Sequence, residues 1–99
     1  MKVETVINQQ IRGYILKVIK LSYPQPVGSN VIDVCLIDAG MPCSMTQLEG
    51  HLHYLTDRGY VTIKSNEMKE IGNRILLVNL TSHGIDVLEG TLKDEGVRL

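Results

Sequence analysis

The sequence predicts a mainly helical α+β protein, in which a three-helix bundle with a helix-turn-helix precedes a β-hairpin and a C-terminal helix. Three observations predict this class. Apolar residues recur at helical spacing through the first 58 positions, two runs rich in β-branched residues follow, and a final capped run returns to helical spacing. A chain of 99 residues fits a single domain, which we expect to span residues 1–99.

The first helix is expected at residues 4–21, where apolar side chains repeat at helical spacing from Ile7 to Val18. The apolar face is wide, so we expect neighbouring elements to cover it on more than one side. Gly13 lies inside this helix and should cost roughly 1 kcal/mol relative to alanine. Prolines at 24 and 26 end the helix, because each disfavours helical geometry at the residue before it.

The second helix is expected at residues 30–39, with Ser29 or Asn30 as its cap. Its residues are apolar nearly all round, which is typical of a short helix buried between neighbours. Gly40 ends it, and only residues 40–43 separate it from the next helix. Two helices joined by such a short glycine-containing turn predict a helix-turn-helix.

The third helix is expected at residues 44–58. Ser44 and Gln47 match a capping box, in which each side chain satisfies a backbone amide of the other residue. Gly59 lies where a glycine ends a helix in the left-handed conformation. Three leucines on one stripe mark the side that faces the core: Leu48, Leu52 and Leu55. Burying that stripe leaves a polar side exposed, formed by Thr46, Gly50, His53, Tyr54 and Asp57, with Gln47, His51 and Arg58 at one flank.

Two strands are expected after this helix, at residues 60–64 and 74–80, joined by a polar loop into a hairpin. Thr81 then caps a last helix, expected at residues 82–92. Acidic residues dominate the outer face of that helix and the tail, and we expect the last few residues to fray.

The order helix, short strand, helix, helix, strand, strand, helix resembles that of winged-helix proteins over essentially the whole chain. The sequence LHYLTDRGYVTI is similar to the end of the recognition helix in MarR, PadR and ArsR-type regulators. The sequence VNLTSHGIDVLEG is similar to the step from their wing into the closing helix. The spacing of Ile15-Leu16, the L-T-x-x-G at 80–84 and Gly96-Val97 is also similar to small winged-helix proteins of Mu-like phages and prophages.

This resemblance implies a DNA-binding transcriptional regulator of phage, prophage or bacterial type. In such proteins the recognition helix enters the major groove of double-stranded DNA, and the wing contacts phosphate or the minor groove. The recognition-helix candidates are Ser44, Thr46, Gln47, Gly50, His51, His53 and Tyr54. The wing candidates are Lys64, Lys69, Asn73 and Arg74. Four basic and two acidic residues give the stretch 58–74 a local net charge of +2, which favours contact with phosphate.

Charge also supports an alternative, a winged-helix adaptor that binds protein rather than DNA. The formal net charge is −1, and residues 44–57 contain no lysine or arginine, which is unusual for a helix that enters a DNA groove. A homodimer through the first and last helices is a further expectation, because both carry much apolar surface. The alternative is that these two helices pack on each other within one core.

A metal or thiol sensor is a weaker hypothesis, based on Cys43, His51 and His53. The two histidines are two positions apart on a helix and point to different sides, so they cannot bind one ion together. Cys43 precedes a helix N-terminus, which can lower a thiol pKa. The simpler interpretation is that Cys35 and Cys43 are reduced packing residues, so we expect no metal and no cofactor.

No phosphate loop, nucleophile elbow or pair of catalytic carboxylates is present in the sequence, so we do not expect an enzyme. No apolar run reaches the roughly 18 residues that a membrane span needs. The first ten residues lack the pattern of a signal peptide. We therefore expect a cytoplasmic protein that does not bind membranes.

Overall fold

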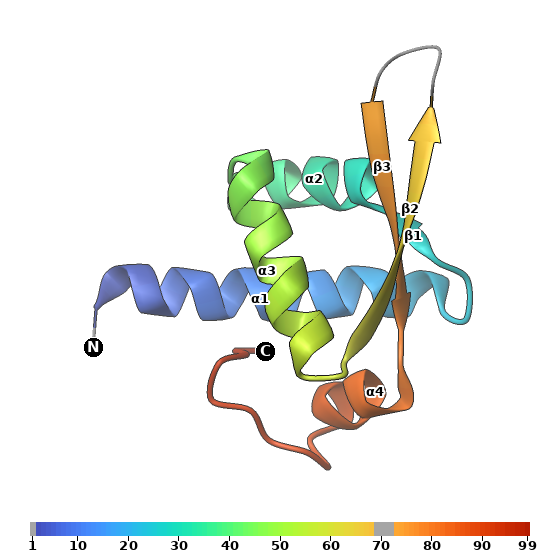
Figure 1. Cartoon of the computed structure of the whole chain (residues 1–99). Helices are drawn as coiled ribbons and strands as arrows, with labels where there is room; N and C mark the ends of the chain where they lie inside the picture. The colour runs from blue at the N-terminus through green and yellow to red at the C-terminus, as the bar shows by residue number, and fades with distance from the viewer. Residues whose placement is uncertain (1, 69–72) are drawn as a thin grey trace.

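The computed structural model describes residues 2–68 and 73–99, which form an α+β fold of four helices and a three-stranded antiparallel sheet (Figure 1). The elements follow the predicted order. They are α1 (Val3–Ser22), β1 (Val27–Gly28), α2 (Ser29–Asp38), α3 (Met45–Asp57), β2 (Val61–Met68), β3 (Asn73–Leu80) and α4 (Ser82–Glu89). Each predicted boundary therefore lies within a few residues of the observed one.

The helices form a layer around α1, and the hairpin of β2 and β3 stands beside them. In Figure 1, α3 crosses in front of α1, and α2 lies above it. The hairpin extends upward past the helices, while α4 closes the opposite end. Among the described residues, no helix is both long enough and apolar enough to cross a membrane.

The sheet has the strand order β1-β3-β2, so β3 is the central strand. Val61 pairs with Leu80, and Ile63 pairs with Val78. Since side chains alternate along a strand, this register turns Val61, Val78 and Leu80 toward the helices, and all three are buried. β1 is only two residues long, and the Ser29 hydroxyl extends its pairing by accepting a hydrogen bond from Leu76 N at 3.0 Å.

The core is aliphatic apart from Tyr60 and draws on every helix and on the sheet. Its fully buried side chains come mainly from α1, α2 and α3, and they are Ile15, Leu16, Ile19, Ile32, Leu36, Leu48, Leu52, Leu55, Val61 and Val78. The predicted leucine stripe of α3 is thus confirmed. The Cα radius of gyration is 13.1 Å, close to the roughly 13 Å expected of a compact chain of this length.

Three predicted helix ends are confirmed. Ser44 and Gln47 form the complete capping box at the start of α3. Gly59 has φ +78° after α3, as a left-handed C-terminal glycine requires. Thr81 accepts a hydrogen bond from Gly84 N at the start of α4 and also donates to Gly59 O at 2.6 Å, so this one hydroxyl joins two elements.

Two expectations for α2 are wrong. Gly28 precedes the helix and makes no side-chain cap, because the Ser29 hydroxyl is already bonded to β3 and Asn30 is inside the helix. The helix is also not buried all round. Val31, Val34 and Ile37 are 48%, 57% and 55% exposed and form an apolar stripe on its outer side.

Coverage of α1 is also less complete than expected. The apolar residues Ile11, Ile15, Leu16, Val18 and Ile19 in its middle are buried. Both ends are uncovered, since Val3 is 73% exposed, Ile7 44% and Leu21 87%. At the other end of the chain, α4 ends at Glu89 rather than near residue 92. Gly90 adopts φ +82° and stops the helix there.

The expectation that the last residues fray is wrong for residues 94–98, which we call the C-terminal strap. Arg98 N donates to Gln9 O at 3.0 Å, which ties the strap to α1. Val97 is buried, and Arg12 donates to Gly96 O at 3.1 Å. The tail is therefore packed across α1 and α3 because hydrogen bonds and one apolar anchor hold it there.

Candidate functional site

The outward side of α3 carries Thr46, Gly50, His53 and Asp57, all of them exposed. This side is polar because the apolar residues of α3, Leu48, Leu52 and Leu55, lie on the opposite side of the helix and face the core. A Cβ atom at Gly50 would meet nothing within 4 Å, so the surface there is open. The exposure expected for these four residues is confirmed.

Ser44 and Gln47 are also exposed, but their side chains are occupied by the capping box. The Ser44 hydroxyl accepts from Gln47 N at 3.1 Å, and Gln47 Oε1 accepts from Ser44 N at 2.9 Å. These bonds satisfy backbone amides that have no partner within the helix. Each oxygen atom keeps a second lone pair, and the Ser44 hydroxyl can still donate its hydrogen, so both side chains can contact a ligand while the cap stays in place.

The expected exposure of His51 is wrong. Its side chain faces α1 and is only 7% exposed, and Arg12 Nε donates to His51 Nδ1 at 3.3 Å. Burial and the neighbouring Arg12 guanidinium lower the pKa of His51. Accepting a hydrogen bond at Nδ1 requires the neutral imidazole, which agrees with that direction.

Tyr54 is half-buried rather than fully exposed. Its ring lies between two guanidinium groups, with Arg12 Cζ 4.0 Å and Arg58 Cζ 4.8 Å from the ring centroid. Its hydroxyl donates to Asp94 Oδ1 at 3.2 Å. The residue is therefore already engaged by charged partners from α1, the end of α3 and the strap.

The hairpin contributes one described cation. Lys64 is exposed on β2. Asn73 and Arg74 lie at the start of β3, opposite Met68 and Glu67, but their side chains lie outside the described part of the structure. Lys69 lies outside the described residues altogether.

Asp94 is the centre of a polar cluster that sequence analysis did not predict. Its side chain is only 4% exposed. Tyr60 donates to Asp94 Oδ2 at 2.6 Å, Gly96 N donates to Oδ1 at 2.7 Å, and Arg58 lies 3.4 Å from Oδ2. The sequence offered no signal for this cluster beyond an acidic residue in the tail, because Asp94 lies 34 to 40 positions from Tyr54, Arg58 and Tyr60.

Burial and hydrogen bonds within the cluster shift the pKa values of Tyr60 and Asp94 in opposite directions. Burial and the hydrogen bond to Asp94 raise the pKa of Tyr60 to about 12. Burial alone would raise the pKa of Asp94, but the hydrogen bonds from Tyr60 and Gly96 N and the charge of Arg58 outweigh it and lower the pKa. The carboxylate is thus held ionised inside the protein by donors aimed at it.

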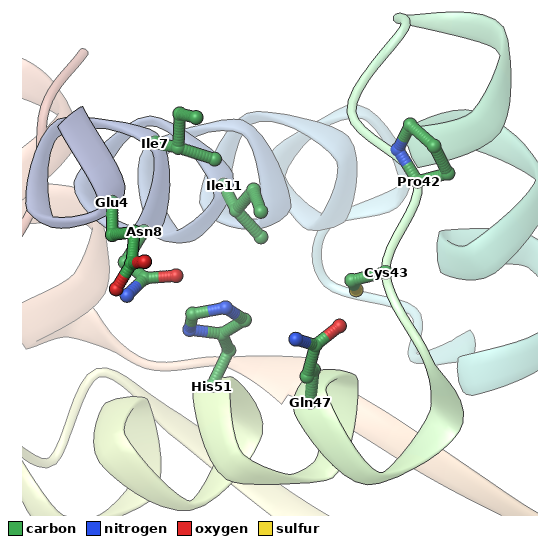
Figure 2. A pocket seen from close by; sticks show the side chains of 8 residues that line it. All are labelled: Glu4, Ile7, Asn8, Ile11, Pro42, Cys43, Gln47 and His51. Carbon is green, nitrogen blue, oxygen red and sulfur yellow. The ribbon is translucent and has the colours of Figure 1, made fainter.

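A pocket of about 370 Å³ lies between the N-terminal half of α1 and the start of α3. Figure 2 shows His51 pointing from α3 toward Glu4 and Asn8 on α1, while Gln47 points toward α1 beside Cys43. Burial and nearby Asp33 raise the pKa of Cys43, so the lowered thiol pKa considered from the sequence is wrong. Cys35 and Cys43 are both free, and the described residues contain no group of three metal-ligating side chains.

Comparisons of this chain with protein-family models, with curated proteins and with solved structures give no match.

Proposed function

We propose that this chain is a small winged-helix DNA-binding protein of phage, prophage or bacterial type, which acts as a cytoplasmic transcriptional regulator. One observation carries the proposal: α3 follows α2 through a short turn, turns a polar face outward, and stands beside a hairpin that projects past the helices (Figure 1). A helix-turn-helix with a neighbouring hairpin is the arrangement that docks on duplex DNA in winged-helix proteins.

In this proposal α3 enters the major groove. The Thr46 hydroxyl and the His53 imidazole can hydrogen-bond to base edges, and the open surface at Gly50 allows the backbone to approach closely. Lys64 on β2 reaches a phosphate. The absence of lysine and arginine from α3 means that base readout there uses neutral side chains, while phosphate contacts come from other elements.

A salt titration with labelled random duplex DNA tests the proposal. We expect affinity to fall steeply between about 50 and 200 mM salt, because phosphate contacts release counterions. Lys64→Ala should weaken binding and reduce the slope of log affinity against log salt by about one. Lys17→Ala is the matched control, since it removes the same charge from an exposed position on α1. No binding at low salt, or an equal loss in both variants, would contradict the proposal.

A specific observation favours a second candidate, a protein–protein adaptor. The apolar stripe of Val31, Val34 and Ile37 on α2 is exposed, and α3 carries Glu49 and Asp57 but no lysine or arginine. Such a surface suits a protein better than a polyanion. The same titration separates the two candidates, because the adaptor should show no affinity for duplex DNA at low salt.

We also propose a homodimer that uses the first and last helices. Its support is the uncovered apolar surface at Val3 and Ile7 on α1 and at Leu92 after α4. Sedimentation equilibrium should then give twice the monomer mass, and Ile7→Asp should return it to the monomer mass. A monomer at high protein concentration would remove this part of the proposal.

A further inference from the structure

The buried Asp94 carboxylate occupies a site that the rest of the domain builds. Among the described residues Asp94 has four hydrogen-bond partners, of which one, Gly96 N, belongs to the C-terminal strap. The other three are the Tyr54 hydroxyl, the Tyr60 hydroxyl and the Arg58 guanidinium, which come from the end of α3 and the start of β2. Two neutral donors and one cation converging on one point make a receptor for an anion.

Two cations surround that receptor. Arg12 and Arg58 both lie against the Tyr54 ring, and the strap supplies an acceptor to each: Gly96 O to Arg12 and the Asp94 carboxylate to Arg58. Without the strap, this stack would keep two positive charges and lose the negative charge that faces them. Its net positive charge would then favour the binding of another anion.

The strap is attached in a way that allows release. It buries the apolar side chain of Val97, and hydrogen bonds join it to Gln9, to Arg12 and to the Asp94 receptor. Arg58 is 52% exposed, so the receptor lies at the surface and a ligand can reach it once the strap lifts. The close approach of the strap depends on Gly13 of α1, where a Cβ atom would collide with the Arg98 carbonyl.

We propose that Tyr54, Arg58 and Tyr60 form a phosphate-binding site that Asp94 fills from within the same chain. When the strap is in place, the site is blocked. When it is released, the two hydroxyls and the guanidinium bind a phosphate group, either free phosphate or a phosphodiester of the DNA backbone. A phosphate carries more oxygen acceptors than a carboxylate and suits a guanidinium equally well. The DNA arm of this proposal rests on the proposed DNA binding, whereas the free-phosphate arm does not.

The first experiment compares Asp94→Ala with Glu95→Ala in the full chain. Both remove one negative charge, but Glu95 is exposed and only Asp94 fills the receptor. Inorganic phosphate is titrated against sodium chloride of equal ionic strength, and the melting temperature is recorded. For Asp94→Ala we expect a rise of roughly 5–10 °C when phosphate exceeds its Kd about tenfold. The wild type and Glu95→Ala should not respond, and adding Arg58→Ala to Asp94→Ala should abolish the response.

The second experiment repeats the DNA salt titration with the same variants. Asp94→Ala should bind duplex DNA more tightly than Glu95→Ala, with a salt slope steeper by about one phosphate contact. If phosphate raises the melting temperature of Asp94→Ala but no variant binds DNA, the DNA function fails and the phosphate site stands. If the wild type binds DNA but phosphate has no effect on Asp94→Ala, the phosphate site is overturned and the DNA function stands.

If Asp94→Ala does not fold, a variant that leaves every charge in place, Gly13→Ala, can test the proposal instead. Gly13→Ala places a methyl group against the Arg98 carbonyl and should displace the strap, whereas Gly50→Ala adds the same group in open space. We expect faster amide exchange at Arg98 and Val97, together with stabilisation by phosphate, in Gly13→Ala only. Strap release measured by exchange without any response to phosphate would overturn the proposal.

Discussion

His51 and Tyr54 lie at positions of α3 where helical periodicity does not separate an exposed side chain from a buried one. In the structure both lie between the leucine stripe and the outward face, although the sequence predicts Tyr54 on the outward face, and both are turned toward Arg12 on α1. The outcome depends on that partner: one arginine bonds to the imidazole and stacks on the phenol. Whether a residue at the edge of the buried stripe is exposed or buried thus depends on the side chain that the neighbouring helix places opposite it.

His51 should make the protein less stable in mild acid. Burial and Arg12 lower its pKa in the folded state below the usual value near 6.5, so the unfolded chain binds the proton more readily. The contribution of neutral His51 to stability is therefore complete above about pH 6.5 and is lost as pH falls below that value. In urea unfolding, the free energy of unfolding should fall less between pH 7.5 and pH 5 for His51→Gln than for the wild type.

His53→Gln is the matched control, because His53 is exposed on the same helix. It should keep the wild-type dependence of unfolding free energy on pH. An identical pH dependence in His51→Gln and the wild type would show that the contact with Arg12 does not couple to protonation.

At the scale of elements, Gly13 shows why a helix can retain a residue that weakens it. Glycine within a helix costs up to about 1 kcal/mol relative to alanine, and α1 accepts that cost where the strap crosses it. The absence of a Cβ atom lets the Arg98 carbonyl approach the helix backbone. Helix propensity and tertiary packing therefore favour different residues at this position, and packing decides.

Gly13→Ala and Gly50→Ala should consequently change stability in opposite directions. In Gly50→Ala the added methyl group meets no atom, so better helix propensity should stabilise the protein by about 0.5–1 kcal/mol. In Gly13→Ala the collision with the strap should outweigh that gain and leave a net loss of about 1–3 kcal/mol. Urea unfolding of both variants measures the difference. A stabilised Gly13→Ala would mean that the strap moves aside at no cost.

At the scale of the whole molecule, the Asp94 cluster joins the end of the chain to elements from the middle of it. Tyr54 belongs to α3, Tyr60 precedes β2, and Asp94 follows α4, so one carboxylate connects three segments. Two further hydrogen bonds, from Arg12 to Gly96 O and from Arg98 N to Gln9 O, hold the residues that follow Asp94, so the acidic tail becomes part of the domain.

The free energy of unfolding should therefore fall in strong alkali, because Tyr60 ionises and loses its hydrogen bond to Asp94. Its pKa is raised from 10 to about 12 in the folded protein, so the hydrogen bond to Asp94 contributes fully below about pH 10 and is lost as pH rises through 12. Tyr60→Phe should cost about 1.5–3 kcal/mol at pH 7, the range for a hydrogen bond to a charged group. The cost should shrink above pH 10. Tyr23→Phe, at an exposed position, is the control, and tyrosine absorbance near 295 nm follows the ionisation.

Local signals predicted most of the framework. The capping box at Ser44 and Gln47, the glycine after α3 and the cap at Thr81 are interactions within a few residues, so the sequence contains all of their partners. The leucine stripe of α3 follows from the helical period alone. The winged-helix proposal and its DNA interface extend these local predictions and await the titrations described above.

The sequence alone determined the order of the elements and the face of α3 that is buried, because spacing and capping act between near neighbours. Tertiary structure decided the rest: the exposed stripe of α2, the burial of His51, and the strap that brings Asp94 to Tyr54 and Tyr60. The contacts of His51 with Arg12 and of Asp94 with Tyr54 and Tyr60 join residues 34 to 40 positions apart. Helical or strand periodicity cannot predict contacts between residues so far apart in the sequence. They depend on how the helices pack and on Gly13, which lets the C-terminal strap pack against α1.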